Sequence, residues 1–316
     1  MANAEEGVAI VGSCNVDLFY YVDSFPKSGE TMFAKTYEEH FGGKGANQAL
    51  QTIKLSSSPE KVIFVGCVGD DKNGRSIINN FKEQGVNNPE KHIHVVDATS
   101  GIASITVDSQ GCNQIILVPG ANFKVLPEHV DASFEDIKKC KVLVCQNEIP
   151  FATTQHALKR AHESGLITIY NPAPFVKVEN LSEVLKYVSV FVPNEVEAAE
   201  LVNKDEIKNT EDAKQIAQEL HSLGAKTVII TLGGNGVMAL HNEEIVHVPV
   251  EKVEKVVDTT GAGDSFVGSL SYFLSCGFEM IQAIKLSNFS ASVSVQGEGT
   301  HRSYPDRACL EKHKKL

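Results

Sequence analysis

The sequence DTTGAGDSF, residues 258–266, lies between a strand-like segment at residues 253–257 and an apolar helical stretch at residues 266–274, which Gly277 is expected to end. Glycines at the start of a helix allow backbone N–H groups to converge on one point, and the helix dipole adds positive potential there. The Gly-Ala-Gly sequence of residues 261–263 is therefore predicted to form an anion hole.

Asp264 follows these three residues directly. Its carboxylate would repel an anion, so its place beside an anion hole makes sense if it handles a proton. A base next to a phosphate site is what phosphoryl transfer to a hydroxyl group requires. The alternative is a glycine-rich turn in which Asp264 caps the helix N-terminus. The chain has no GxxxxGK[ST] sequence and no GxGxxG after a strand, which excludes a P-loop and gives a dinucleotide-binding fold little support.

Short runs rich in β-branched residues alternate with amphipathic stretches over most of the chain. These runs, typical of strands buried on both faces, are residues 8–11, 62–65, 142–144, 166–170, 188–192 and 227–231. Between two of them, residues 210–223 have apolar side chains at helical spacing and are followed by Gly224. Repeated strand–helix–strand order predicts an α/β fold with a mostly parallel sheet.

Residues 17–40 and 99–118 break this pattern, because apolar and polar residues alternate in them with a period of two. We interpret both regions as antiparallel strands of a small second sheet. One face of such a sheet would be exposed, so it would cover a ligand or pair with another chain. A hairpin without a function is the alternative.

Polar residues suited to a polyhydroxylated ligand follow the first predicted strand. Asn15 and Asp17 come just after it, and the glycine-rich residues 42–47 open a predicted helix. Asn and Asp side chains supply the donors and acceptors that sugar hydroxyl groups need, and open parallel sheets bind ligands beyond the carboxyl ends of their strands. A polar turn followed by a glycine-rich helix start is the alternative.

Two further features follow predicted strands. Asn194 and Glu197 are three residues apart, so on a first helical turn they would share a face and could hold a hydrated Mg²⁺. The same spacing is typical of a helix-capping pair, which we favour for this motif taken alone. Residues 231–236 form a flexible loop that suits a nucleotide base or ribose.

Composition narrows the class of protein. The 316 residues include 29 Lys and Arg against 40 Asp and Glu, a net charge of −11, which argues against nucleic acid or an anionic membrane as partner. No apolar run approaches the roughly 20 residues that span a bilayer, and the start MANAEEG does not resemble a leader peptide. Seven cysteines without a CxxC pair predict free, buried or half-buried thiols rather than disulfides or a zinc site.

Three motifs in this order resemble those of the ribokinase-like, PfkB-type sugar kinase family. They are FGGKGANQA at residues 41–49, the pair Asn194 and Glu197, and DTTGAGDSF at residues 258–266. The resemblance covers nearly the whole chain and implies a ribokinase-like three-layer α/β fold, with a mostly parallel central sheet and helices on both faces. It also implies a single domain over residues 1–316, with a small β-sheet lid formed by about residues 17–40 and 99–118.

Within the family, GGKGANQA and the early Asn15-x-Asp17 look most like the ribokinases. This resemblance implies ATP-dependent phosphorylation of D-ribose at O5, giving D-ribose 5-phosphate and ADP. Asp264 would be the general base. The backbone N–H groups that would stabilise the transferring γ-phosphoryl group are those of Gly261, Ala262 and Gly263.

The resemblance implies further sets of binding residues. Those for the sugar are Asn15, Asp17, Gly43, Lys44, Asn47, Glu148 and Asp264. Those for ATP are Asn194, Thr231, Gly233, Gly236, Gly263 and Asn288. Glu197 would organise Mg²⁺. The residues for an activating K⁺ would be Asp258, Thr260, Ser294, Gly297, Gly299 and Ser303.

The resemblance also implies a homodimer formed through the lid, with small molecules as the remaining partners. The composition and the cysteine usage predict a cytoplasmic location, with the nucleus as a second possibility. The nearest competing function is a sister kinase that acts on deoxyribose, fructose or adenosine. A catalytically silent sugar- or nucleotide-binding regulator competes less well, since Asp264 and the glycines beside it are retained. An oxidoreductase comes third, because the dinucleotide-binding sequence is missing.

Overall fold

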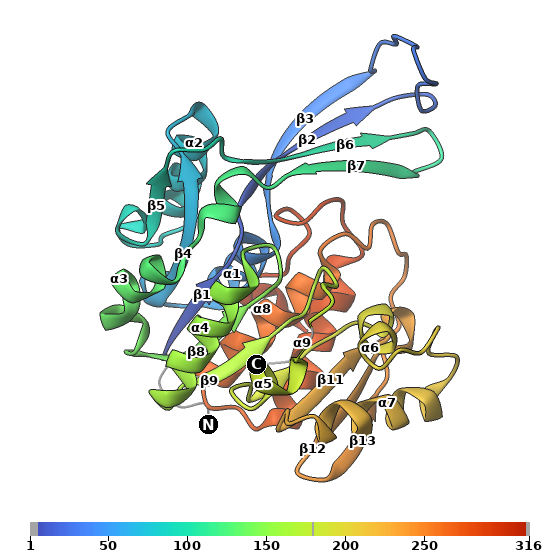
Figure 1. Ribbon diagram of the computed structural model, residues 1–316. Helices are drawn as coiled ribbons and strands as arrows, with labels where there is room; N and C mark the ends of the chain where they lie inside the picture. The colour runs from blue at the N-terminus through green and yellow to red at the C-terminus, as the bar shows by residue number, and fades with distance from the viewer. Residues whose placement is uncertain (1–5, 179, 314–316) are drawn as a thin grey trace.

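The computed structural model describes residues 6–178 and 180–313, and these form two sheets with helices around the larger one (Figure 1). The large sheet has nine strands in the order β13-β12-β11-β10-β9-β8-β1-β4-β5. Their bounds are β1 Gly7–Val11, β4 Val62–Gly69, β5 Ile93–Val96, β8 Cys140–Cys145, β9 Ile167–Tyr170, β10 Val190–Phe191, β11 Thr227–Thr231, β12 Val237–His241 and β13 Glu244–Val248. All neighbours pair in parallel except β12, which is antiparallel to β11 and β13.

Helices cover both faces of this sheet, as the β-branched strands require. The helices packed against one face are α1 Lys44–Leu55, α2 Lys72–Glu83, α8 Ala262–Ser275, α9 Met280–Ser294 and α10 Arg307–Lys312. Those against the other are α3 Pro127–Ile137, α4 Phe151–Glu163, α5 Leu181–Leu185, α6 Glu195–Leu201 and α7 Thr210–Ser222. Short 3₁₀ helices are η1 Pro59–Lys61, η2 Pro89–Lys91, η3 Gly120–Lys124 and η4 Gly233–Asn235. The predicted three-layer α/β fold is confirmed.

The second sheet projects from the main body (Figure 1) and has the order β3-β2-β6-β7. Its strands are β2 Asn15–Tyr21, β3 Thr36–Gly42, β6 Gly101–Val107 and β7 Asn113–Val118. The β2–β3 and β6–β7 pairs are antiparallel, as predicted, but β2 and β6 pair in parallel. Between the two hairpins the chain returns to the large sheet, so it enters the small sheet twice from the same end.

One predicted strand is wrong. Residues 253–257 have no strand, and Val256 is 55% exposed. This segment crosses from β13 at the edge of the large sheet to the start of α8, where Val250, Val253 and Val256 line a cavity. The side chains of Val253 and Val256 therefore line that cavity rather than a sheet face.

In the part of the chain that the structure describes, no helix is long and apolar enough to cross a membrane. The seven cysteines are free, as predicted, and most are buried. Cys309 is half-buried, and Cys112 lies exposed at the turn between β6 and β7, which the prediction of buried or half-buried thiols did not expect.

Candidate active site

The carboxyl ends of the parallel strands bring the sequence motifs to one end of the large sheet. Glu148 lies just beyond β8, Asn171 follows β9, and Asn194 lies just beyond β10. The N-termini of α1 and α8 reach the same place, since Asn47 donates to Asp264 across them. Motifs more than 200 residues apart in the sequence are thus in direct contact.

Asp264 is the centre of this arrangement. It is buried, and each of its carboxylate oxygens accepts a hydrogen bond from a side-chain amide of α1: Oδ2 from Asn47 at 3.0 Å and Oδ1 from Gln48 at 2.9 Å. Helix α8 is capped by Gly261, and Asp264 makes no capping bond, so the interpretation of Asp264 as an N-cap is wrong. Burial raises its pKa, and the Lys44 ammonium and both amides act in the opposite direction.

Lys44 is the cation among the carboxylates of the site. Burial acts to lower its pKa, but the charges of Asp264, Glu148 and Glu197 together raise it. The ammonium group therefore stays protonated and partly neutralises three carboxylates.

Asp17 belongs to β2 of the small sheet, and its carboxylate lies close enough to those of Glu148 and Asp264 to be repelled by them. Burial, with added repulsion from Glu148 and Asp264, raises the pKa of Asp17 to about 7. Glu148 Oε2 accepts hydrogen bonds from the Ser13 hydroxyl at 2.6 Å and from the Lys44 N–H at 2.9 Å. Asp17 Oδ1 is buried and has no hydrogen-bond partner among the described residues.

Asn15 and Asn47 also belong to the residues predicted to bind the sugar. Both are buried, and Asn15 Oδ1 accepts a hydrogen bond from Asn122 Nδ2 at 2.7 Å. Asn47 Oδ1 is buried without a hydrogen-bond partner in the described part of the chain. Buried oxygens of this kind need a donor, because an unpaired buried acceptor costs about 1–3 kcal/mol.

The turn before α1 requires glycine at residue 43. Gly43 has φ 88°, and a Cβ there would lie 2.9 Å from Cys14 Cα. This close approach places the start of α1 against the chain that leaves β1, and so sets Lys44 and Asn47 beside Asn15.

A cavity of about 610 Å³ lies beside Asp264. Asp264 and Lys44 border it, together with all the residues predicted to contact ATP: Asn194, Thr231, Gly233, Gly236, Gly263 and Asn288. Asn288 Nδ2 donates to the Pro249 carbonyl at 2.9 Å, which holds that side chain in the cavity wall. The predicted sugar and ATP residues therefore meet at Asp264.

The start of α8 has the turn predicted for an anion hole. Gly261 has φ 73°, and a Cβ there would lie 2.5 Å from the Tyr304 hydroxyl, so a larger residue does not fit. The Ala262 N–H donates to the Thr259 carbonyl at 3.2 Å. A Cβ on Gly263 would meet no atom within 4 Å, so this residue borders the open cavity.

Asn194 and Glu197 form the capping pair favoured for their spacing. The Asn194 side chain accepts the Glu197 N–H at 2.8 Å, and Glu197 Oε2 accepts the Asn194 N–H at 2.9 Å. Both residues also line the cavity. Burial raises the pKa of Glu197, against the effect of the Asn194 hydrogen bond and of Lys44.

The residues predicted for K⁺ lie in the loop before α8, at the end of α9 and in the loop after α9: Asp258, Thr260, Ser294, Gly297, Gly299 and Ser303. The Asp258 carboxylate accepts the N–H groups of Thr260 and Gly299, both at 2.9 Å. Ser303 donates its hydroxyl to the Gly299 carbonyl at 2.6 Å. Burial acts to raise the pKa of Asp258, but these hydrogen bonds lower it overall, so the group stays ionised.

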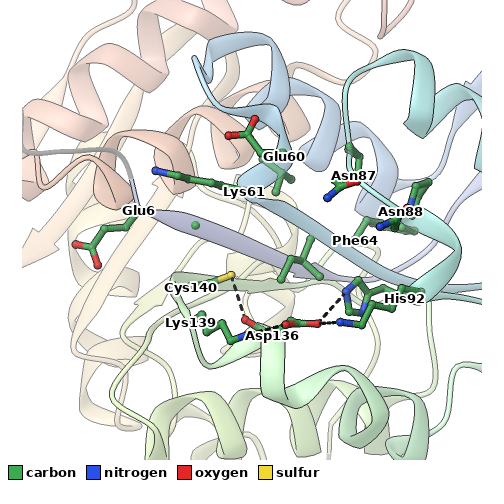
Figure 2. A pocket seen from close by; sticks show the side chains of 16 residues that line it. Glu6, Glu60, Lys61, Phe64, Asn87, Asn88, His92, Asp136, Lys139 and Cys140 are labelled. Carbon is green, nitrogen blue, oxygen red and sulfur yellow. Dashed lines mark hydrogen bonds and ion pairs between the residues drawn. The ribbon is translucent and has the colours of Figure 1, made fainter.

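A second cavity, of about 510 Å³, lies near the amino ends of β1, β4 and β8 (Figure 2). Its central carboxylate, Asp136, is paired with Lys91 and Lys139 and lies 3.5 Å from His92. None of the sequence motifs reaches it. Since the charges of this second cavity neutralise one another, we place the active site in the cavity bordered by Asp264.

The sequence motifs did not assign roles to three buried amides of the site: Gln48, Asn122 and Asn171. Gln48 lies inside the FGGKGANQA motif, and Asn171 follows a predicted strand just as Asn194 does, so both carried a usable signal. Asn122 carried none. It contacts Cys14 and Asn15 only because η3 folds back against them.

Known carbohydrate kinases are similar to this chain over most of its length. A profile described as "pfkB family carbohydrate kinase" matches residues 5–307. The chain is 39% identical to ribokinase of Mus musculus over 302 residues, 94% of this chain and 91% of that protein. It is 36% identical to deoxyribokinase of Salmonella typhi over 299 residues, 94% of this chain and 95% of that protein. The structure of Arabidopsis thaliana ribokinase complexed with ribose and ATP matches with a TM-score of 0.89 at 30% identity, covering 99% of both chains.

These matches extend over nearly the whole chain. The chain belongs to the pfkB family of carbohydrate kinases and catalyses ATP-dependent phosphorylation of a sugar.

Proposed function

We propose that the chain is a kinase of D-ribose, which it phosphorylates at O5 to give D-ribose 5-phosphate and ADP. The observation that carries this proposal is the pair of buried acceptors, Asp17 Oδ1 and Asn47 Oδ1, which lack partners among the described residues beside Asp264. Sugar hydroxyl groups are the donors that would satisfy them. The mouse relative named ribokinase and the Arabidopsis ribokinase complexed with ribose and ATP support ribose as the acceptor.

In the proposed reaction Asp264 accepts the proton of the sugar hydroxyl while that oxygen forms a bond to the γ-phosphorus of ATP. The bond between this phosphorus and the oxygen bridging to the β-phosphate breaks, and ADP leaves with that electron pair. Lys44 and the N–H groups of Gly261 and Gly263 stabilise the negative charge on the transferring group. The predicted contribution of Ala262 is not included, because its N–H already donates to the Thr259 carbonyl. The hydrogen bonds from Asn47 and Gln48 favour the ionised form of Asp264, which is the form that can act as base.

The site residues fit the two metal ions proposed with ATP. Glu197 places a buried carboxylate at the cavity, and Mg²⁺ is commonly held by one or two carboxylates plus substrate phosphates and water. The ionised Asp258, the Ser303 hydroxyl and nearby backbone carbonyls are oxygen donors that suit K⁺. When bound, Mg²⁺ would neutralise phosphate charge, and K⁺ would add positive potential beside the anion hole.

The small sheet is proposed to act as a lid over the sugar and as the contact between two copies of the chain. Its edge strand β7 is exposed along its length, and Ile115, Ile116, Leu117 and Val118 are 43–70% exposed. An exposed apolar edge of this kind is normally covered in soluble proteins. We further propose that the enzyme works in the cytoplasm, where its free thiols would stay reduced.

The experiment that tests the function is ADP release with Mg²⁺–ATP across ribose, 2-deoxyribose, fructose and adenosine, each in K⁺ and in Na⁺ buffer. We expect ribose to give the highest kcat/KM and K⁺ to raise it. Higher kcat/KM with 2-deoxyribose would identify a deoxyribokinase, like the Salmonella relative, and would contradict the proposed substrate. Equal rates in both buffers would contradict the K⁺ site while leaving the sugar assignment intact.

Replacing Ile116 with Asp is expected to convert the dimer to a monomer, because the change puts a charge into an apolar contact. Sedimentation equilibrium at micromolar concentration measures this. Gln114→Asp is the matched control, since Gln114 is an exposed polar residue of the same strand. A wild-type protein that sediments as a monomer would refute the lid dimer.

A further inference from the structure

Gln48 belongs to a chain of buried side-chain amides beneath Asp264. It lies on α1 and is fully buried. Its Nε2 donates to Asp264 Oδ1 at 2.9 Å and to Asn171 Oδ1 at 3.1 Å, and its Oε1 accepts from Gln146 Nε2 at 2.7 Å. Both N–H donors of the Gln48 amide are therefore in use.

The orientation of this amide is determined by the backbone. Asn171 Nδ2 donates to the Val192 carbonyl at 2.8 Å, so Asn171 Oδ1 must face Gln48. A reversed Gln48 amide would set its oxygen against two acceptors, Asp264 Oδ1 and Asn171 Oδ1, and its nitrogen against the Gln146 donor. The backbone carbonyl at residue 192 thus fixes Asn171, which fixes Gln48.

This chain fixes the plane of the Asp264 carboxylate. Asn47 binds one oxygen and Gln48 the other, and the two donors are consecutive residues of one rigid helix. Rotation of the carboxylate would break at least one of these buried hydrogen bonds. Asn47 also carries the unpaired Oδ1 that we assign to the sugar, whereas all the hydrogen bonds described for the Gln48 side chain are to protein.

We propose that Gln48 is a positioning residue, whose locked amide holds the Asp264 carboxylate in the orientation and ionisation state that the reaction needs. This inference rests on the proposed function, because it concerns the base of that reaction. Other ionisable groups also influence Asp264 through charge: Lys44, Asp17, Glu148, Glu197 and Tyr304. Lys44 alone among these favours ionisation of Asp264, so the two neutral amide donors supply the remaining stabilisation.

The test is the pH profile of ribose phosphorylation by Gln48→Met, which keeps the length of the side chain but removes both donors. Loss of the donor raises the pKa of Asp264. On acidification the variant therefore loses its activity at a higher pH than the wild type does. We expect the acid limb of kcat to move up by about one pH unit, the size expected for one hydrogen bond to a charged group. The plateau of kcat is expected to fall about tenfold, and the KM for ribose to change less than about twofold.

Gln51→Met is the matched control. Gln51 lies one turn further along α1 and is equally buried, but it bonds Ser265 and the Pro305 carbonyl instead of Asp264. Its replacement removes an equally buried amide, and we expect a comparable fall in the melting temperature. We expect its acid limb to coincide with that of the wild type.

An acid limb of Gln48→Met that coincides with the wild-type limb would overturn the proposal, and so would an equal shift in Gln51→Met. If Gln48→Met does not fold, Gln146→Met decides, because it removes only the donor to Gln48 Oε1. A smaller upward shift is expected there, and no shift would refute the locked amide. Failure of the proposed function is distinguishable, since the wild type itself would then lack ribose-dependent turnover.

Discussion

Replacing Asp264 with Asn is expected to lower kcat for sugar phosphorylation by about 10²–10⁴-fold, the range typical of losing a general base. The amide cannot accept the proton of the attacking hydroxyl. It also presents an NH₂ group to one of the two donors, Asn47 Nδ2 or Gln48 Nε2, so one hydrogen bond is lost. Steady-state ADP release measures the loss.

The fold is expected to survive this change, because it also removes a buried charge whose desolvation raises the pKa of Asp264. A thermal melt within a few degrees of the wild type, together with retained ribose binding by calorimetry, is the control. Near-normal turnover in such a folded, ribose-binding variant would show that Asp264 is not the base.

Replacing Lys44 with Met is expected to lower kcat/KM by about 10²-fold or more and to move the acid limb of activity upward. Two effects combine. A cation that stabilises the transferring phosphoryl group is lost. The pKa of Asp264 also rises, since Lys44 is the largest influence that opposes burial there, so a higher pH is needed to keep the base ionised. The pH dependence of kcat/KM for ribose measures both effects.

Lys44→Arg separates these effects. It keeps the positive charge near Asp264, so the acid limb should stay close to the wild-type position even if the bulkier guanidinium raises the KM. A Lys44→Met enzyme with an unshifted acid limb would contradict the charge coupling between Lys44 and Asp264. An Arg variant shifted as far as the Met variant would show that shape rather than charge governs the limb.

Much of the fold was predictable because strand burial and helix periodicity are local signals. The helix expected at residues 210–223 is observed at Thr210–Ser222, where Asn209 caps its start. The strand expected at residues 253–257 is wrong, because a strand also needs a neighbouring strand to pair with, and the local pattern does not show whether there is one. Its three valines are β-branched and favour a strand, but no strand that the structure describes is paired with them, and Val253 and Val256 line the cavity instead.

The predicted ATP residues and Asp264 were found at one cavity because each carries a residue-type signal at the end of a strand or the start of a helix. The supporting amides were missed, because a Gln or Asn acquires a role only from its neighbours. Asn122 donates to Asn15 from 107 residues further along the chain, and no local sequence pattern predicts that contact.

The sequence by itself determined the class of fold and the positions of the glycine turns, and it singled out Asp264 as the proposed base, since backbone conformation and proton chemistry depend on residue type. Only the tertiary structure decided the ionisation of the carboxylates. Asp17, Glu197 and Asp264 come from three distant segments. Burial raises the pKa of each of them, and the Lys44 ammonium opposes this rise at Glu197 and Asp264. Charge interactions act through space and not along the chain, so they exist only once the parallel strands have brought these residues to one end of the sheet.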